Sequence, residues 1–270
     1  MSEKKYAILD TDFVSKSNII MNDDEHVLAD LVLEFPEYSF SCHEMMVEEL
    51  NRHGTRMSQS WLRDKIANGV IEKYTDEDIL NLLSLEVGEE CYSVFLRFLK
   101  ASCDIYEKNY FEGKYASLAA LLNNSIEKQD FLDELKKCDD EIGVHQSLGE
   151  KKAYVLLQAL RFVKGDNVFL FCSDDFGARC AMANVACIPC ISVVAVFMKL
   201  KNMGVSKSEA APYFQSYIEW CNRHKQTQMY VWKINGAKRR VKKDLRDVFD
   251  GLYKDEFSLM LNGDLLIKQA

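Results

Sequence analysis

The sequence contains little of what marks linkers, membrane anchors or nucleotide-binding loops. Among 270 residues there are 3 prolines and 12 glycines, which argues against long disordered linkers. No apolar run reaches the length of a membrane-spanning helix, and the first residues lack the apolar region of a signal peptide. Neither a Walker-type loop nor a Gly-x-Gly-x-x-Gly fingerprint is present, so ATP and dinucleotide binding are not indicated. We therefore expect a cytoplasmic protein with no membrane association.

The cysteines and histidines show no strong metal-ligand or disulfide pattern. The 9 cysteines are odd in number and lie mostly inside apolar stretches, which is typical of small buried side chains. Cys187 and Cys190 have Cys-x-x-Cys spacing, but no second pair stands out, so we interpret them as structural. The 5 histidines show no metal-ligand spacing. The net charge of −8 argues against non-specific coating of nucleic acid but allows a local basic patch.

The hydrophobic pattern predicts an α/β protein with an interruption. Hydrophobic residues make up 48% and charged residues 28%, as in ordinary globular domains. Alternating strand and helix patterns occupy 1–54 and 141–198, which we expect to form one discontinuous domain with a parallel sheet. Helical periodicity without proline fills 55–140, which predicts an all-helical insertion. Residues 199–270 form a C-terminal α+β extension in this interpretation.

Individual elements can be placed from apolar runs and capping signals. We expect strands at 6–9, 38–40, 168–172 and 187–196, and helices at 28–35, 43–52, 150–163 and 177–184. Ser41/Glu44 and Ser206/Glu209 have the form of capping boxes, Ser147/Glu150 also fits one, and Thr75 with Asp78 marks a helix start. Asn235-Gly236, between the segments 230–234 and 237–243, predicts a β-hairpin.

Carboxylates occur where the predicted elements could bring them to one place. Asp10 follows the first strand, and Asp174 and Asp175 follow the strand ending at Cys172. Ligand sites in open α/β sheets form outside the carboxyl ends of the strands, and Glu49 and Glu150 lie on predicted helices. Such a group of like charges needs a cation, and oxygen ligands select Mg²⁺ or Mn²⁺. This pattern suggests metal-dependent phosphoryl transfer.

These residues resemble the PIN-domain nuclease family. The matching segments are 8–12 (Ile-Leu-Asp-Thr-Asp), 47–50 (Val-Glu-Glu-Leu), 148–150 (Leu-Gly-Glu) and 172–179 (Cys-Ser-Asp-Asp-Phe-Gly-Ala-Arg). The resemblance covers roughly 5–54 and 145–198, but neither the insertion nor the extension. It implies a three-layer α/β/α fold, an acidic Mg²⁺ or Mn²⁺ site, and hydrolysis of phosphodiester bonds, usually in RNA.

The resemblance also implies a role for each acidic position. Asp10, Glu49, Glu150 and Asp175 would be catalytic, with Glu49 preferred over its neighbour because it directly precedes a leucine. The metal ligands would be Asp10, Glu150, Asp174 and Asp175, with Asp174 acting through water. Asp12 and Ser173 would support the ligands, Ser173 by hydrogen bonding to carboxylates or metal-bound water.

Each acidic position also has a structural interpretation that the sequence leaves open. Asp10 could be an ordinary loop or cap residue after a buried strand, and Asp12 could cap a helix. Glu150 could complete a capping box with Ser147 in place of binding metal.

A basic run in the extension is a candidate nucleic-acid surface. Tyr230 and Trp232 precede it and could stack on bases. Arg179 could contact a substrate phosphate or form a structural ion pair. The alternative for the whole run is a solvated hairpin and helix surface. The basic residues are Lys233, Lys238, Arg239, Arg240, Lys242, Lys243 and Arg246.

Together these patterns predict a metal-dependent endoribonuclease that binds RNA. Many relatives act as toxins neutralised by a partner protein, although this chain is much longer than a minimal single-domain toxin. The insertion could restrict access, recognise a structured RNA, or assemble a homo-oligomer. Two alternatives stay open: an inactive PIN-like binding or scaffold module, and a structure-specific DNA nuclease using the same metal chemistry.

Overall fold

The computed structural model describes residues 5–106, 109–122, 126–142, 147–165, 169–235 and 237–268, and within them it has α/β architecture. The strands are β1 (Lys5–Leu9), β2 (Tyr38–His43), β3 (Ile71–Tyr74), β4 (Phe169–Cys172), β5 (Cys190–Ile191), β6 (Gln228–Asn235), β7 (Ala237–Asp244), β8 (Phe257–Leu259) and β9 (Leu265–Ile267). The helices of the first half are α1 (Thr11–Ile19), α2 (Leu28–Leu33), α3 (Glu44–His53), α4 (Arg56–Ala67), α5 (Asp76–Val87), the 3₁₀ helix η1 (Gly88–Glu90), α6 (Cys91–Tyr106), α7 (Tyr110–Lys114) and α8 (Ala116–Leu121). The helices of the second half are α9 (Lys128–Ile142), α10 (Leu148–Lys164), α11 (Phe176–Val185), α12 (Val193–Asn202), α13 (Lys207–Arg223) and α14 (Leu245–Tyr253).

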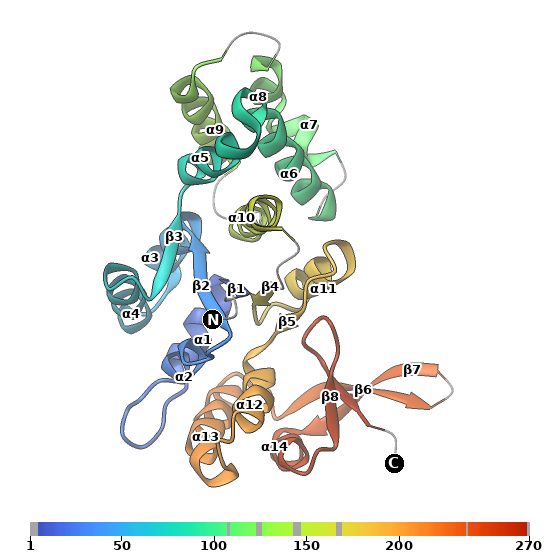
Figure 1. The fold of residues 1–270 in the computed structure, drawn as a ribbon. Helices are drawn as coiled ribbons and strands as arrows, with labels where there is room; N and C mark the ends of the chain where they lie inside the picture. The colour runs from blue at the N-terminus through green and yellow to red at the C-terminus, as the bar shows by residue number, and fades with distance from the viewer. Residues whose placement is uncertain are drawn as a thin grey trace. The chain divides into compact units, whose positions relative to one another are not determined.

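The strands form two sheets, labelled in Figure 1. The first is a five-stranded parallel sheet in the order β3-β2-β1-β4-β5, with Phe40 opposite Ile71 and Phe171 opposite Cys190. The second has the order β7-β6-β9-β8 and contains the antiparallel pairs β6–β7 and β8–β9. The predicted α/β class with a parallel sheet is therefore confirmed.

The chain divides into two compact units. The first unit comprises Met1–Thr11, Ser39–Gly54 and Leu62–Phe169, and the second comprises Asp12–Tyr38, Thr55–Trp61 and Leu170–Ala270. No helix in the described ranges is both long enough and apolar enough to cross a membrane.

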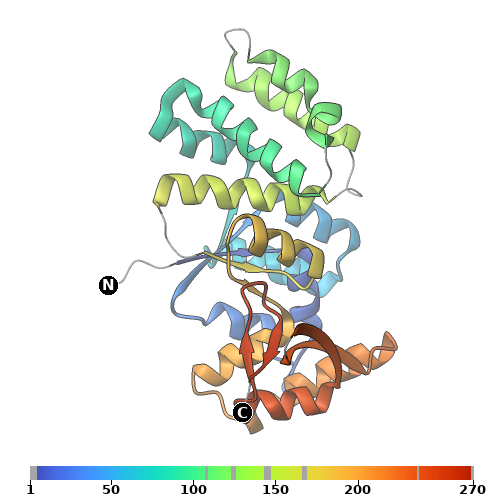
Figure 2. The same ribbon diagram turned by 90° about the vertical axis from the view of Figure 1, so that its right-hand side faces the viewer.

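Helix α10 is the centre of the helical part of the first unit. It packs against α5 and α6, and Figure 2 shows it in yellow-green beside the teal and green helices. Val155, Leu156, Leu157 and Leu160 are fully buried, so the helix is apolar on more than one side. A helix that is apolar around most of its circumference is expected to be covered by other elements on several sides.

A buried group of charges ties α10 to α5 and α9. The Lys152 side chain is 0% exposed, and its Nζ lies 2.7 Å from Oδ2 of Asp76 and 2.7 Å from Oδ2 of Asp139. Tyr115 donates a 2.7 Å hydrogen bond to Oδ1 of Asp139, and Nε2 of His43 lies 3.3 Å from Oδ1 of Asp76. Burial opposes the charged form of Lys152, but the two carboxylates outweigh it and raise the pKa of Lys152. This buried ion triple joins side chains of α5, α9 and α10.

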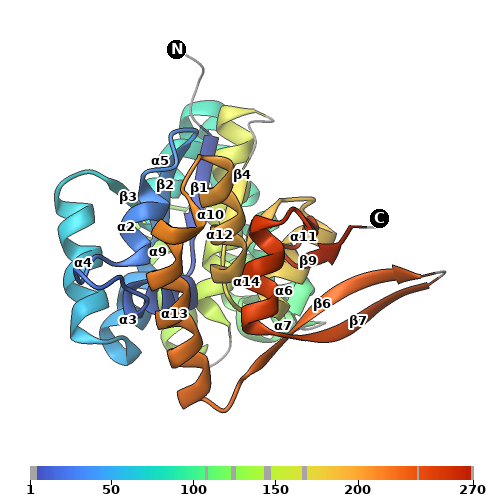
Figure 3. The same ribbon diagram turned by 90° about the horizontal axis from the view of Figure 1, so that it is seen from below.

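The second unit has an aromatic core between α12, α13 and α14. The ring of Phe214 lies 4.9 Å from that of Phe197 and 4.4 Å from that of Phe249, centroid to centroid. The hairpin β6–β7 extends away from α14, as Figure 3 shows. The predicted hairpin is confirmed by its continuous antiparallel pairing, although Gly236 itself lies outside the described residues.

Two element predictions are wrong. The apolar segment 187–196 forms the two-residue strand β5 followed by α12, because Ser192 accepts a hydrogen bond from the Ala195 N–H and caps a helix there. Short apolar runs do not distinguish a buried strand from a buried helix. The segment 55–140 is not all-helical, since β3 lies within it and pairs with β2.

One of the three capping boxes that the sequence suggested is confirmed. Ser206/Glu209 forms the capping box at α13, and the helix start predicted at Thr75 is confirmed, where a capping box with Asp78 begins α5. Ser41/Glu44 does not, because β2 continues to His43 and the His43 ring accepts the hydrogen bond from the Met45 N–H at the start of α3. Ser147/Glu150 does not either, as described below. The other predicted helices and strands are present with shifted ends, and Val168 lies outside the described residues.

Candidate metal and nucleic-acid site

Three of the predicted acidic residues belong to the first unit. Asp10 directly follows β1 and is 6% exposed, so its carboxylate is held in the interior. Glu49 lies on α3, and Glu150 lies in the first turn of α10, where it is half-buried. The helix N-terminus favours a negative charge at Glu150 because its N–H groups carry partial positive charge.

The Glu49 carboxylate is fixed by two hydrogen bonds and by a close approach to backbone. The Thr11 hydroxyl donates to Oε2 at 2.7 Å, and the Gly149 N–H donates to Oε1 at 3.1 Å. A Cβ atom on Gly149 would lie 2.5 Å from both carboxylate oxygens of Glu49. Only glycine at position 149 therefore leaves room for the Glu49 carboxylate in this position. This explains why glycine is the central residue of the motif Leu148-Gly149-Glu150.

Ser147 does not form the capping box that the sequence suggested. Its backbone has a left-handed conformation with φ 53°, and its side chain makes no capping hydrogen bond. A capping box needs an N-cap side chain that accepts from the third residue of the helix. The capping-box interpretation of Glu150 is therefore wrong.

The turn after β4 carries the acidic residues of the second unit. Ser173 accepts a 3.1 Å hydrogen bond from the Asp175 N–H, and Oδ1 of Asp175 accepts one of 2.6 Å from the Ala178 N–H. Asp175 is thus the N-cap of α11, which fixes its carboxylate while its second oxygen is not needed for the cap. Ser173 is fully buried and orients the backbone of this turn.

Asp174 faces a lysine that the sequence reading did not single out. Its Oδ1 accepts from the Val193 N–H at 3.1 Å, and its Oδ2 lies 2.5 Å from Nζ of Lys16. Lys16 also lies 3.2 Å from Asp12, one helical turn away on α1. Burial opposes the charged form of Lys16, but Asp174 and Asp12 together raise its pKa. A charged ammonium group therefore neutralises Asp174, where the sequence predicted a metal. The Asp12–Lys16 spacing was readable as an i,i+4 pair.

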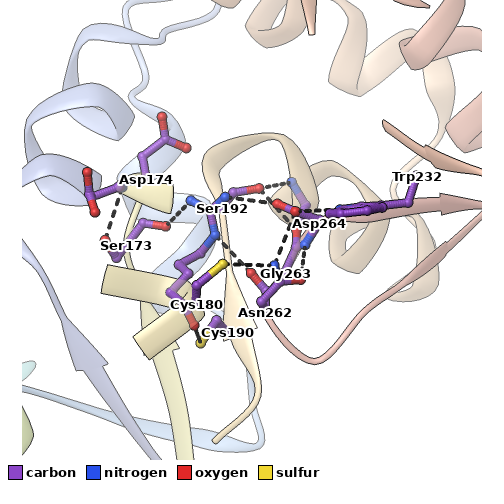
Figure 4. Close-up of polar contacts among 12 residues, drawn as sticks. Ser173, Asp174, Cys180, Cys190, Ser192, Trp232, Asn262, Gly263 and Asp264 are labelled. Carbon is purple, nitrogen blue, oxygen red and sulfur yellow. Dashed lines mark hydrogen bonds and ion pairs between the residues drawn. The ribbon is translucent and has the colours of Figure 1, made fainter. Parts of the chain in front are cut away.

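Arg179 is buried and its guanidinium is committed to neighbouring groups. It donates to the carbonyl of Asn262 at 2.9 Å, to the carbonyl of Ser173 at 3.1 Å, and to Asp264 at 3.1 Å. Asp264 also accepts from Nε1 of Trp232 at 2.8 Å, and Figure 4 shows Asp264 between Trp232 and the turn of Ser173. Of the two roles considered for Arg179, the contacts in the structure are those of a structural ion pair. Asp264 lay outside every sequence pattern considered above.

An open cavity of about 560 Å³ joins the turn after β4 to the basic hairpin within the second unit. Asp174 and Arg179 line one end, and Tyr230, Arg240 and Lys242 line another. Lys16 and Lys225 add positive charge to the lining, and Asp264 adds the second carboxylate. Cations outnumber carboxylates in this cavity, so it is suited to an anionic ligand.

The predicted basic residues differ in their surroundings. Lys238, Arg239, Arg240 and Lys242 are exposed, whereas Lys243 is half-buried and lies 3.7 Å from Glu256. Arg240 and Lys242 reach the cavity described above.

All nine cysteines are free thiols. Cys190 is buried and donates to the Arg179 carbonyl at 3.4 Å, which fits a structural role. Cys187 is exposed and is likewise a free thiol.

Within the ranges that the structure describes, no group of three or more histidine, cysteine, aspartate or glutamate side chains is arranged to hold a metal ion. Asp10, Glu49 and Glu150 belong to one unit, and Asp174 and Asp175 belong to the other, so their convergence stays a prediction. Comparison with known proteins adds no assignment: no family model, no curated protein and no solved structure matches the chain.

Proposed function

We propose that the protein is a Mg²⁺- or Mn²⁺-dependent endoribonuclease with a PIN-like three-layer α/β/α fold. The observation that carries the proposal is the cavity of the second unit. It joins a carboxylate-bearing turn at the end of a parallel strand to the exposed cations of the hairpin β6–β7. The exposed cations would attract the phosphodiester backbone, and the same turn carries Asp175, which we propose as a ligand of the ion that hydrolysis requires.

The donor chemistry of the acidic residues fits a hard divalent cation. Hydrogen bonds from Thr11 and Gly149 fix the Glu49 carboxylate, which occupies space that a Cβ atom on residue 149 would fill. We propose that Asp10, Glu150 and Asp175 would hold the ion and that Glu49 would orient the attacking water or accept its proton. The bound ion would supply charge stabilisation at the phosphate and a water of lowered pKa.

We propose roles that do not depend on the ion for residues of the cavity and of the turn beside it. Arg240 and Lys242 would bind substrate phosphates, and Ser173 and Arg179 would maintain the turn that presents Asp174 and Asp175. A metal at Asp174 would have to compete with Lys16, so we place Asp174 outside the first choice of direct ligands.

The ammonium of Lys16 also favours a second candidate function. A lysine between Asp12 and Asp174 already neutralises these carboxylates, as in a site that needs no metal. A PIN-like module that binds RNA without cleaving it would have this property. A DNA nuclease with the same metal chemistry is tested by substituting DNA for RNA in the assay below.

Calorimetric titration of Mn²⁺ tests the proposal. We expect wild-type protein to bind Mn²⁺ and to cleave RNA only in the presence of Mn²⁺ or Mg²⁺, with EDTA as the control. The double variant Asp10→Asn/Asp175→Asn should lose both properties because two ligands lose their charge. Absence of Mn²⁺ binding by the wild type would refute the nuclease and support the binding module.

Gly149→Ala provides a test that leaves every carboxylate in the chain. The new Cβ would collide with the Glu49 carboxylate, which is the end of a flexible side chain and can move. We expect cleavage to fall by about tenfold or more, since small misplacements of catalytic groups are costly. The free energy of unfolding should stay the same or rise slightly, because alanine is a better helix former than glycine. Gly113→Ala is the matched control, since no atom lies within 4 Å of its added Cβ.

A further inference from the structure

The register of the hairpin sorts its side chains onto two faces. Residues directly opposite each other in an antiparallel pair share a face, and successive residues alternate between faces. We call the face formed by Tyr230/Lys242, Trp232/Arg240 and Ile234/Lys238 the aromatic face. The opposite face carries Met229/Lys243, Val231/Val241 and Lys233/Arg239.

The aromatic face alternates rings with cations. Nζ of Lys238 lies 4.7 Å from the Trp232 ring, and the guanidinium of Arg240 lies 4.6 Å from the Tyr230 ring. Nζ of Lys242 lies 5.4 Å from the Tyr230 ring. Tyr230 is 48% exposed, so much of its surface is accessible to a ligand. A ring next to a cation offers a stacking surface and a phosphate contact within one or two residues.

The opposite face is partly occupied by the protein's own core. Val231 is fully buried, and Lys243 lies over the ring of Phe257 at 5.2 Å as well as near Glu256. Lys233 and Arg239 are exposed there without a tyrosine or tryptophan on the same face. Both faces of the hairpin therefore carry comparable positive charge, but only the aromatic face carries the Tyr230 and Trp232 rings.

We infer that the aromatic face of β6–β7 binds a single nucleic-acid strand, with a base stacked on Tyr230 and phosphates on Lys238, Arg240 and Lys242. Bases expose their flat surfaces to a side chain only when they are not enclosed in a duplex. The face leads into the cavity that contains Asp174, since Tyr230, Arg240 and Lys242 line it. The inference rests on the proposed function for the identity of the strand as a substrate, but the binding itself needs no cleavage.

The two faces provide matched variants for a binding experiment. Fluorescence anisotropy of the full chain is measured in EDTA with a labelled 12-nucleotide polyuridylate and with an RNA duplex of the same length. Arg240→Ala/Lys242→Ala and Lys233→Ala/Arg239→Ala each remove two positive charges from the same hairpin. We expect the first pair to weaken polyuridylate binding by more than about tenfold and to reduce the salt slope by about 1.4. The second pair should change affinity by less than about threefold.

Stacking is tested separately from charge. Tyr230→Ala should weaken polyuridylate binding by about 5- to 150-fold, as measured for base–aromatic contacts. Tyr230→Leu retains apolar volume and should show most of the same loss, which separates stacking from a loss of hairpin structure. Circular dichroism of each variant checks that the fold is retained.

Three outcomes would overturn the inference: equal losses for the two charge pairs, duplex binding as tight as single-strand binding, or competition by polyglutamate at the same charge concentration. Failure of the nuclease is distinguishable from failure of the inference. Face-selective binding without metal-dependent cleavage would refute the proposed enzyme alone. Cleavage with no difference between the two faces would refute this inference alone.

Discussion

Lys152→Met is expected to lower the free energy of unfolding by about 3–5 kcal/mol, the cost of removing one partner from a buried ion pair. The substitution leaves Asp76 and Asp139 together in the interior without the ammonium that lies 2.7 Å from each. Two buried carboxylates then repel each other and lack solvation. Urea unfolding of the wild type and the variant at pH 7 measures the difference.

Lowering the pH should reduce the difference in free energy of unfolding between Lys152→Met and the wild type. In the wild type, burial works against ionisation of Asp76, but Lys152 and His43 hold its pKa below the usual range. Burial already raises the pKa of Asp139 in the wild type. Without Lys152 the folded-state pKa of Asp76 should also rise above its unfolded value, and that of Asp139 should rise further. Groups of this kind contribute stability at low pH and lose it as the pH rises through the folded pKa. The variant should therefore be closer to the wild type at pH 5 than at pH 7.

Two further variants identify the cause of the Lys152→Met effect. Lys128→Met removes an exposed ion pair with Glu77 in the same unit and should leave the free energy of unfolding nearly unchanged. Adding Asp76→Asn and Asp139→Asn to Lys152→Met should restore much of the lost stability because no buried charge is left uncompensated. A triple variant as unstable as Lys152→Met would show that lost packing, and not charge, is responsible.

Asp10→Asn is expected to lower the rate of metal-dependent RNA cleavage by about a hundredfold or more, similar to the loss of other strongly electrostatic catalytic contacts. The buried Asp10 carboxylate would lose the charge that we propose binds the ion. If the proposed acidic group forms, the fold should stay intact or become slightly more stable without metal, because one of its like charges is removed. Single-turnover cleavage at saturating Mn²⁺ is the measurement, and wild-type activity in Asp10→Asn would exclude the mechanism.

Asp175→Asn should show the same loss of cleavage without loss of the helix cap. Asparagine caps helices about as well as aspartate, so the hydrogen bond from the Ala178 N–H can be retained. Asp175→Ala would lose both the charge and the cap and should cost about 1 kcal/mol of stability in addition. Asp23→Asn, which removes an exposed carboxylate from the second unit, is the control for a general effect of charge.

Much of the fold could be predicted because apolar periodicity and local capping act over a few residues. The α5 and α13 starts follow from Thr75/Asp78 and Ser206/Glu209, and the hairpin follows from its turn and flanking strands. Strand β3 was missed because its four residues carry a weak apolar signal between two helices. Segment 187–196 was assigned to the wrong element because a short buried run is equally compatible with β5 or α12.

The site could be predicted as a set of residue types but not as a set of contacts. The position of Asp175 as a cap and the approach of Gly149 to Glu49 depend on atoms 3 and 100 residues apart. The partner of Asp174 lies 158 residues away in the sequence, and the partner of Arg179 lies 85 residues away. Periodicity carries no information about such pairs. The pairing of Lys16 with Asp174 and that of Asp264 with Arg179 could therefore be identified only from the folded chain.

The contact between Arg179 and Asp264 has a consequence during synthesis on the ribosome. The arginine that holds the Ser173 carbonyl receives its carboxylate partner 85 residues later. While the nascent chain is shorter than this, the guanidinium must be solvated or burial of the turn must wait. The turn that presents Asp174 and Asp175 is thus completed late, and a chain terminated before Asp264 would lack the support of its acidic residues.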